Sequence, residues 1–153
     1  MSILGAHHVS FSVTDLEKTV HFYQDVLGLT LRSRSRNEYD GLGTSLFGTK
    51  WGLTQSHADL QIAVMELGDN QIEFIQYNDP AAKPYHMDPS VAGSAHLAIR
   101  TDDIVAERKR LEDRGVEFHA PINVFAETGK PDWKWCYFRD PDGICLELVE
   151  SDG

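Results

Sequence analysis

The sequence predicts an α+β fold built as two copies of one unit, in which a strand and a helix precede about three further strands. The first observation is an internal repeat, because "HVSFSVTDLEKTVHFYQDVLGLTL" from His8 aligns with "HLAIRTDDIVAERKRLEDRGVEF" from His96. Each segment opens with a histidine and a short apolar strand, and its helical stretch stops at a glycine, Gly28 or Gly115. The second observation is that each copy ends in two strands joined by a tight turn, which is typical of a β-hairpin.

The first copy begins with the strand at His8 and continues into an amphipathic helix. Thr14 and Glu17 fit a capping box at the start of this helix. Its apolar residues recur at helical spacing and form one stripe to bury: Leu16, Val20, Tyr23 and Leu27. Gly28 suits the left-handed position that ends many helices, and an apolar strand is expected directly after it.

The second copy repeats this order. Asp102 is the expected N-cap of its helix, Gly115 ends the helix, and residues 116–118 are expected to begin the next apolar strand. Hairpins close both copies: residues 59–77 turn at Gly-Asp-Asn, and residues 134–150 turn at Asp-Pro-Asp-Gly.

Two segments lack this periodicity. Residues 36–57, rich in Gly, Ser and Thr, are expected to contain one strand and a long loop. Residues 78–93, "NDPAAKPYHMDPSVAG", are the expected linker between the halves. We therefore place the two modules at residues 1–90 and 91–153 of one compact domain formed by internal duplication.

Composition excludes several classes of protein. The formal net charge of −10 argues against a nucleic-acid partner, which requires a basic surface. No apolar run approaches the roughly 20 residues that span a bilayer, and "MSILGAHHVS" lacks the features of a signal peptide. Cys136 and Cys145 are too few for a disulfide scaffold and are expected to be reduced. We expect a cytoplasmic protein without a membrane or nucleic-acid partner.

Strand alternation directs one candidate metal ligand from each of four strands to the face opposite the apolar one. The apolar faces are expected to lie under the helices, so the opposite faces look into a second compartment. The candidates on those faces are His8, Glu73, His96 and Glu147. A histidine opens each half and a glutamate lies in the last strand of each half. Because a single His or Glu in a strand usually faces water, the prediction depends on the symmetric set.

Two imidazoles and two carboxylates suit a divalent cation such as Zn, Ni, Co, Mn or Fe(II), and leave positions for water or substrate. The ion would also neutralise Glu147, which lies in the apolar stretch "ICLELV" and would be unfavourable there without a partner. His7 competes with His8, but alternation turns it to the helix side and its repeat counterpart is Ala95. We therefore exclude His7.

These motifs resemble the vicinal oxygen chelate superfamily, which includes glyoxalase I, methylmalonyl-CoA epimerase, extradiol dioxygenases, fosfomycin resistance enzymes and bleomycin resistance proteins. The resemblance covers nearly the whole chain and rests on "HVSFSVTDLEKTVHFYQDVLGL", "HLAIRTDDI" and "FRDPDGICLELVE". It implies paired βαβββ modules whose curled sheets form a metal-binding cup, a homodimer, and metal ligands at the four positions given above. Glyoxalase I enzymes have a glutamate at the position of Glu73, so the sequence looks most like glyoxalase I.

The resemblance further implies a metal-dependent lyase or isomerase of the glyoxalase type that acts on a small molecule. The metal ion would chelate two vicinal oxygens of the substrate and stabilise an enediolate during proton transfer. Glu73 and Glu147 are the expected catalytic carboxylates, since either can remove the proton next to the carbonyl. The symmetry of the repeat leaves open which of them is the base.

Four residues are expected to contact the substrate. Tyr77 and Ile75 share a strand face with the first candidate glutamate. Trp135 flanks a Pro- and Gly-containing segment that would form a lid, although plain packing explains it equally well. Arg34 would hold an anionic substrate tail, and the alternative is a basic edge strand that faces water.

Three other functions are compatible with this resemblance. An Fe(II)-dependent extradiol-type dioxygenase needs only two histidines and one carboxylate, and Glu73 would occupy one of its open positions. A CoA-thioester epimerase would differ from the leading interpretation in its substrate. A non-catalytic protein that binds a drug in the same cup would lack the ligand set, and all four candidates are intact here.

Overall fold

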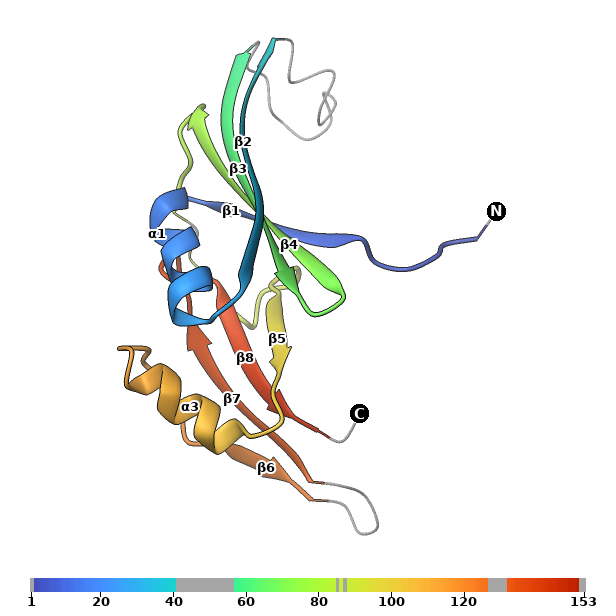
Figure 1. The fold of residues 1–153 in the computed structure, drawn as a ribbon, viewed down its shortest axis with the longest axis vertical. Coiled ribbons are helices and arrows are strands. Elements are labelled where there is room, and N and C mark those ends of the chain that lie inside the picture. Colours follow the sequence, from blue (N-terminus) through green and yellow to red (C-terminus); the bar gives the residue numbers. More distant parts are fainter. Residues whose placement is uncertain (1, 41–56, 85, 87, 127–131, 152–153) are drawn as a thin grey trace. The chain divides into compact units, whose positions relative to one another are not determined.

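The computed structural model describes residues 2–40, 57–84, 86, 88–126 and 132–151. The chain divides into two compact units, Met1–Pro84 and Tyr85–Gly153, each with its own sheet. Both units have the order strand, helix and three strands, so the predicted α+β fold of two βαβββ modules is confirmed (Figure 1).

The first unit holds four strands and one helix: β1 (His8–Val13), α1 (Leu16–His21) with a π-helical last turn η1 (Phe22–Val26), β2 (Thr30–Asp40), β3 (His57–Leu67) and β4 (Asn70–Asp79). The sheet order is β1-β4-β3-β2. The first strand is parallel to β4, and the other neighbours are antiparallel. The last strand therefore lies in the interior of the sheet, directly beside the first.

The second unit repeats this topology: β5 (His96–Arg100), α3 (Ile104–Glu112), β6 (Asn123–Phe125), β7 (Trp133–Arg139) and β8 (Cys145–Glu150), in the order β5-β8-β7-β6. The first strand is again parallel to the last. This pairing brings the beginning of each repeat beside its end, which is the arrangement that a histidine in the first strand and a glutamate in the last require in order to meet.

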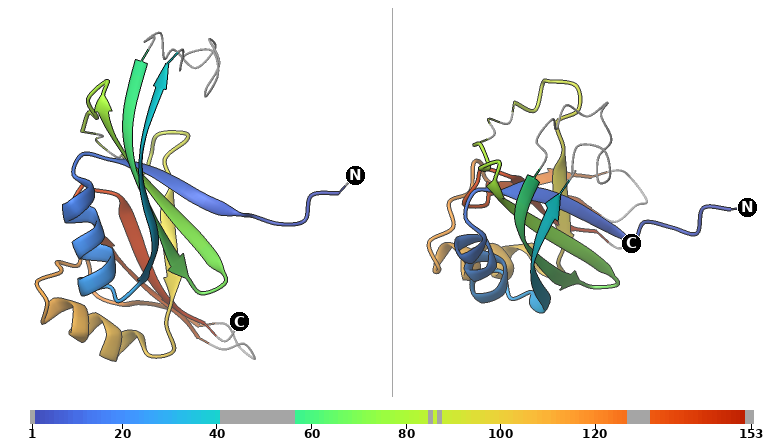
Figure 2. Two further views of the ribbon diagram at one scale, coloured as in Figure 1. Left: turned by 45° about the horizontal axis from the view of Figure 1, so that its top comes forward. Right: turned by 90° about the horizontal axis from the view of Figure 1, so that it is seen from above.

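One face of each sheet is covered by the helix of its own unit (Figure 2). In the first unit the ring of Tyr23 lies 4.3 Å, between centroids, from that of Phe74, and both side chains are fully buried. In the second unit Ile104, Leu111 and Leu146 are also fully buried. Burial of side chains of this size contributes about 1.5–3 kcal/mol each. Of the predicted apolar helical stripe, Leu16, Val20 and Tyr23 are buried and Leu27 is half-buried.

The N-caps of both helices lie one residue further along the chain than predicted. Asp15, not Thr14, caps α1, and its Oδ1 accepts a hydrogen bond of 3.1 Å from the Lys18 N–H. Asp103, not Asp102, caps α3 and accepts from the N–H groups of Val105 and Ala106. A carboxylate reaches the second or third amide of a helix from the residue just before it, and in both copies that residue is the repeated aspartate.

Glycine ends both helices as predicted. Gly28 has φ of 89° and Gly115 has φ of 87°, the left-handed conformation that residues with a Cβ rarely adopt.

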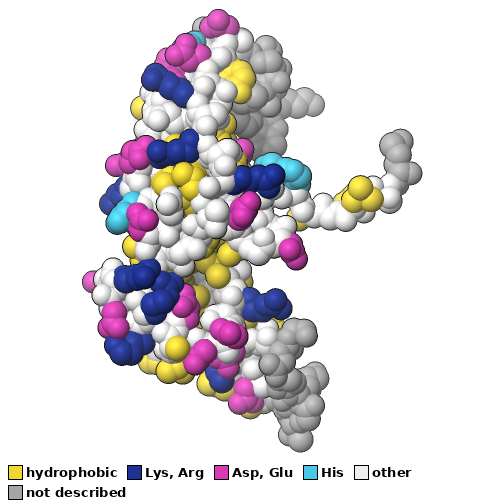
Figure 3. All heavy atoms as spheres, in the orientation of Figure 1, with side chains coloured by type: hydrophobic (Ala, Val, Ile, Leu, Met, Phe, Trp, Pro, Cys, Tyr) yellow, Lys and Arg dark blue, Asp and Glu magenta, His cyan; other side chains and the backbone are white. Residues whose placement is uncertain are grey.

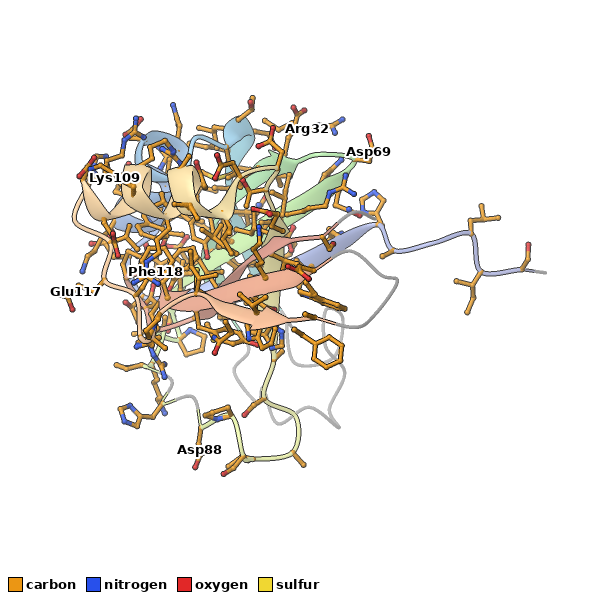
Figure 4. All side chains as sticks on the ribbon, turned by 90° about the horizontal axis from the view of Figure 1, so that it is seen from below. Arg32, Asp69, Asp88, Lys109, Glu117 and Phe118 are labelled. Carbon is orange, nitrogen blue, oxygen red and sulfur yellow. The ribbon has the colours of Figure 1, made fainter. Side chains whose placement is uncertain are left out.

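The strand predicted at residues 116–118 is wrong. Phe118 forms one isolated bridge with Phe138, and the strand begins only at Asn123. Pro121 lies between them and has no N–H to donate to a ladder, which accounts for the interruption. Phe118 packs beneath α3 (Figure 4), where the Arg108 guanidinium carbon lies 4.7 Å from its ring centroid. The predicted loop at 36–57 falls mostly outside the described residues, and residues 36–40 are the end of β2. The predicted lid segment at 127–133 also falls mostly outside them, and Trp133 is the first residue of β7.

The surface carries acidic and basic side chains in close mixture over the faces drawn in Figure 3. Among the described residues, none of the helices has both the length and the apolar character needed to cross a membrane. Cys136 is buried and Cys145 half-buried, and both are free thiols.

Candidate functional site

The first histidine–glutamate pair lies on the sheet face opposite α1. His8 comes from β1 and Glu73 from β4, and the parallel register places Ser10 directly beside Glu73. The distance from His8 Nε2 to Glu73 Oε1 is 3.9 Å, and the side chains are 41% and 25% exposed. His8 Nδ1 lies 2.8 Å from His7 Nδ1, so Nε2 is the ring nitrogen directed toward the carboxylate.

The second pair is the counterpart of the first in the other unit. His96 comes from β5 and Glu147 from β8, with Ala98 beside Glu147 in the parallel register. His96 Nε2 lies 3.1 Å from Glu147 Oε2. The Glu147 side chain is only 9% exposed, whereas that of His96 is 49% exposed. The carboxylate of this pair is therefore far more enclosed than Glu73.

Tyr137 is a second difference between the surroundings of the two pairs. It lies on β7 directly opposite Glu147, and its ring meets the His96 ring edge-on at 5.6 Å between centroids. Burial, the charge of Glu147 and a hydrogen bond from the phenol to Glu147 all raise the pKa of Tyr137. The residue at the equivalent place in the first unit is Val64, opposite Glu73, which has no polar group to donate. Glu147 thus has two polar side chains as neighbours, His96 and Tyr137, and Glu73 has one, His8.

The turn before β8 sets the direction of Glu147. Asp140 is buried, and its Oδ1 accepts hydrogen bonds from the N–H groups of Asp142 and Ile144 at 2.9 and 2.8 Å. Gly143 has φ of 85°, which completes this tight loop. The resulting register pairs Arg139 with Cys145 and Tyr137 with Glu147. A slip of one residue would turn Glu147 toward the helix and Leu146 away from it.

The structure brings the four candidate ligands together as two pairs. Within the ranges that the structure describes, no three His, Cys, Asp or Glu side chains gather closely enough to hold one metal ion. Each pair offers one imidazole and one carboxylate. We use the term half-site for His8 with Glu73 and for His96 with Glu147.

Three of the four predicted substrate contacts share a face with a half-site. Ile75 and Tyr77 lie two and four residues after Glu73 on β4, and therefore on the same face of the sheet. Both pack on the apolar cluster of Ala58 and Leu60. Burial and the nearby charge of Glu73 raise the pKa of Tyr77. Trp135 pairs with Val149, two residues after Glu147, and so lies on the Glu147 face of its sheet.

Arg34 lies on the opposite face. It pairs with Ala63, which pairs with Phe74, so its side chain is on the helix-covered side of the first sheet. Its Nη2 lies 2.6 Å from Glu17 Oε1. The bulge between Leu31 and Ser33 places Arg32 outside the regular alternation. The structure thus does not bring Arg34 to the Glu73 half-site.

Sequence reasoning missed two kinds of residue that support this region. Tyr137 could have been found from the turn alone, because a hairpin that closes between Arg139 and Cys145 places residue 137 opposite residue 147. The other kind is the side chain three residues after each glutamate. Gln76 Oε1 accepts from the Leu16 N–H at 2.6 Å, and Glu150 Oε2 accepts from the Ile104 N–H at 2.8 Å.

Comparison with known proteins gives a consistent result. The sequence model of the Glyoxalase/Bleomycin resistance protein/Dioxygenase superfamily matches residues 5–148. The chain is 28% identical to a 2-epi-5-epi-valiolone epimerase of Actinomyces sp, over 95% of this chain and 79% of that protein. It is 28% identical to a lactoylglutathione lyase of Haemophilus influenzae, over 94% of this chain and 90% of that protein. A glyoxalase family protein from Bacillus cereus has a similar fold, with a TM-score of 0.75 and 24% identity over 100% of this chain and 97% of its own.

Proposed function

The chain belongs to the Glyoxalase/Bleomycin resistance protein/Dioxygenase superfamily, and we propose that it is a divalent-metal-dependent lyase or isomerase of the glyoxalase type. The observation that carries the proposal is the repeated histidine–glutamate pair, one on the open face of each sheet. Two half-sites, from one chain or from two copies, supply two imidazoles and two carboxylates. This donor set suits Zn, Ni, Co, Mn or Fe(II).

The geometry of the pairs fits a metal ion. Two ligands that each lie about 2.1 Å from a metal at angles of 90–110° are about 3.0–3.4 Å apart. The 3.1 Å separation of His96 Nε2 from Glu147 Oε2 falls in this range. The 3.9 Å separation in the first pair lies outside this range, so the fit to a metal ion rests on the second pair. A bound ion would also neutralise the charge of the buried Glu147, in addition to its contact with His96.

A divalent ion held by His8, Glu73, His96 and Glu147 would supply Lewis-acid polarisation of the substrate carbonyl. The chain itself must then remove a proton from the carbon next to the carbonyl. We assign this role to Glu73, because its carboxylate is more exposed and its one ionic contact in the described residues is the 3.9 Å approach to His8. Glu147, held by His96 and Tyr137, is assigned as the fixed ligand.

Substitution of the two glutamates tests the proposal. We expect Glu73→Gln to retain bound metal and to lower proton-transfer activity by about 10²-fold or more, because the base is lost. We expect Glu147→Gln to lose metal affinity and, through it, activity. Metal content by elemental analysis and deuterium incorporation from D2O into α-hydroxy-ketones and hemithioacetals are the measurements. Glu117→Gln, at an exposed position that points away from the sheet in Figure 4, is the control. If both site variants keep full activity, the mechanism is wrong.

A second candidate is an epimerase, which the 28% identity to the 2-epi-5-epi-valiolone epimerase favours. Removal and return of a proton next to a carbonyl serves both reactions, so the same residues carry the same roles. The reaction products distinguish the two functions. An epimerase returns the same substrate skeleton with one inverted, deuterium-labelled carbon, whereas a lyase or isomerase of the glyoxalase type moves the oxidation level between neighbouring carbons. Product analysis of the same D2O reactions distinguishes them.

The proposal includes a homodimer working on a small-molecule substrate in the cytoplasm. Exposed apolar side chains support self-association: Ile3 and Leu4 are 97% exposed in the extended segment before β1 (Figure 2), and Phe125 and Trp133 are 57% and 53% exposed. Light scattering behind a sizing column would give twice the 17.2 kDa mass of the chain. A mass equal to one chain would remove the dimer from the proposal.

A further inference from the structure

A pocket of about 480 Å³ lies within the second unit, on the same sheet face as the second half-site. Its wall comes from the segment before β5, from the residues after α3, and from β5, β7 and β8: Pro89, Ser94, Ala95, His96, His119, Tyr137, Arg139 and Cys145. The polar side chains of this wall can all donate hydrogen bonds. No carboxylate lines the pocket among the described residues, although the whole chain has a net charge of −10.

Arg139 is the cationic group of this pocket, and it is held in place. Its Nη1 donates a hydrogen bond of 2.9 Å to the carbonyl oxygen of Gly143, across the turn that precedes β8. The side chain is exposed to the pocket, and within the described residues the other N–H groups of the guanidinium have no partner. A guanidinium offers five N–H donors in a rigid fork that matches a carboxylate or a phosphate.

His119 adds a second donor from a different segment. It follows α3, and its backbone N–H donates a hydrogen bond of 2.9 Å to the carbonyl oxygen of Tyr137 on β7. This bond fixes the backbone while the imidazole stays exposed on the pocket wall. Two donor side chains on separate segments, each anchored by a backbone contact, form a site for an anion rather than one stray surface charge.

The register relates this pair of donors to the half-site. Arg139 pairs with Cys145, and Cys145 pairs with His96, so the three residues form one row across β7, β8 and β5. Two strand spacings amount to about 10 Å between the backbones of Arg139 and His96. An anion held by Arg139 would therefore lie a few atoms away from oxygens bound beside His96.

We propose that this pocket binds a carboxylate or phosphate group through Arg139 and His119, and that the substrate is a small organic anion that carries such a group. The anion site stands on the pocket alone, whereas its assignment to the substrate rests on the proposed function. The remaining volume, next to Tyr137 and the half-site, would hold the part of the substrate that reacts.

The test is anion binding to the protein stripped of metal. Sodium phosphate and sodium acetate are titrated separately, at constant ionic strength set with chloride, and binding is followed by calorimetry and by backbone amide shifts. We expect saturable binding that Arg139→Gln weakens by about tenfold or more, since a charge-assisted hydrogen bond is lost. His119→Gln is expected to weaken it about threefold. Arg32→Gln, at an exposed arginine of the first unit (Figure 4), should bind like the unchanged protein.

The outcomes separate cleanly. Binding of phosphate without acetate assigns phosphorylated substrates, and binding of both includes carboxylic acids. No saturable binding, or binding that both pocket variants leave unchanged, overturns the proposal. If thermal unfolding shows that Arg139→Gln disturbs the turn, the anion affinity of His119→Gln alone tests the proposal. Metal content is measured in parallel. A protein that binds phosphate through Arg139 but takes up no metal would support the anion site and contradict the proposed reaction. A protein that takes up metal but binds no anion would support the proposed reaction and contradict the anion site.

Discussion

At the level of single residues, the repeat makes Glu73 and Glu147 equivalent, and their neighbours make them different. Tyr137 lies opposite Glu147, whose charge raises the pKa of the phenol, while Val64 lies opposite Glu73. Because a hydroxyl that orients a ligand carboxylate typically accounts for about 10- to 100-fold in metal affinity, Tyr137 is expected to act as a positioning residue.

Tyr137→Phe should therefore lower metal affinity about tenfold or more while leaving the stability of the metal-free protein within about 1 kcal/mol, since only a hydroxyl is removed. Competition against a chromophoric chelator gives the affinity, and urea unfolding gives the stability. Tyr39→Phe, in the apolar cluster of the first unit, is a matched control. Equal metal affinity in Tyr137→Phe and the unchanged protein would refute the positioning role.

The candidate ligands could be chosen from the sequence because they needed only strand alternation and the repeat. Arg34 could not be placed in this way. A bulge between Leu31 and Ser33 breaks the alternation of β2, and side-chain periodicity cannot reveal a bulge. Its contact with Glu17 on α1 depends on tertiary packing. Contacts set by local periodicity were predictable, and those set by an irregular register were not.

At the level of secondary-structure elements, each helix is tied to the last strand of its unit by one side chain. Gln76 accepts from the first amide of α1, and Glu150 accepts from the first amide of α3. The two are three residues after the half-site glutamates, so the same strand positions a candidate ligand on one face and caps a helix on the other. The contact with α1 is thus made by a neutral side chain, Gln76, and the equivalent contact with α3 by a charged one, Glu150.

This difference predicts a pH effect for Glu150. The Ile104 N–H first, and then the ion pair with Lys134, lower the pKa of Glu150 below its ordinary value. Because the carboxylate binds a proton more weakly in the folded than in the unfolded chain, its contribution is present above the unfolded pKa and is lost as pH falls through the folded pKa. Glu150→Gln, which imitates Gln76, should remove this dependence.

Urea unfolding of both proteins between pH 7 and pH 3 measures the effect. The unchanged protein should be more stable than Glu150→Gln at pH 7, and the difference should shrink toward zero in the acid range. A difference that stays constant across the range would mean that the charge of Glu150 contributes nothing.

Element order was the best-predicted property, because periodicity and glycine stops recur in both copies. The boundaries were less predictable. Both N-caps were misplaced by one residue, since Thr14 and Asp102 are themselves good capping residues and local preference cannot choose between neighbours. The strand at 116–118 failed because apolar residues suggest a strand whether or not a partner strand is available, and Pro121 interrupts the ladder there.

At the level of the whole molecule, duplication explains why a half-site occurs twice. Each unit pairs its first strand with its last, and so each unit alone can bring one histidine to one glutamate. One imidazole and one carboxylate bind a divalent ion weakly, and the proposed metal site therefore needs the ligands of both pairs. Repeat symmetry predicted one convergent set of four ligands, whereas the part of the chain that the structure describes gives one histidine–glutamate pair in each unit. How the two pairs are combined is a question of assembly that no periodicity encodes.

Metal stoichiometry in histidine variants tests whether the half-sites act together. If one ion uses both half-sites, the protein binds one equivalent per chain, and His8→Gln or His96→Gln alone should abolish tight binding. An ion bound only to the folded state stabilises it by about 2.7 kcal/mol at 100 times its Kd, so each variant should also lose the rise in Tm that metal produces. His7→Gln, one residue from His8 and in contact with it, should behave like the unchanged protein. Two equivalents per chain, with one surviving in each variant, would instead show that the half-sites are independent.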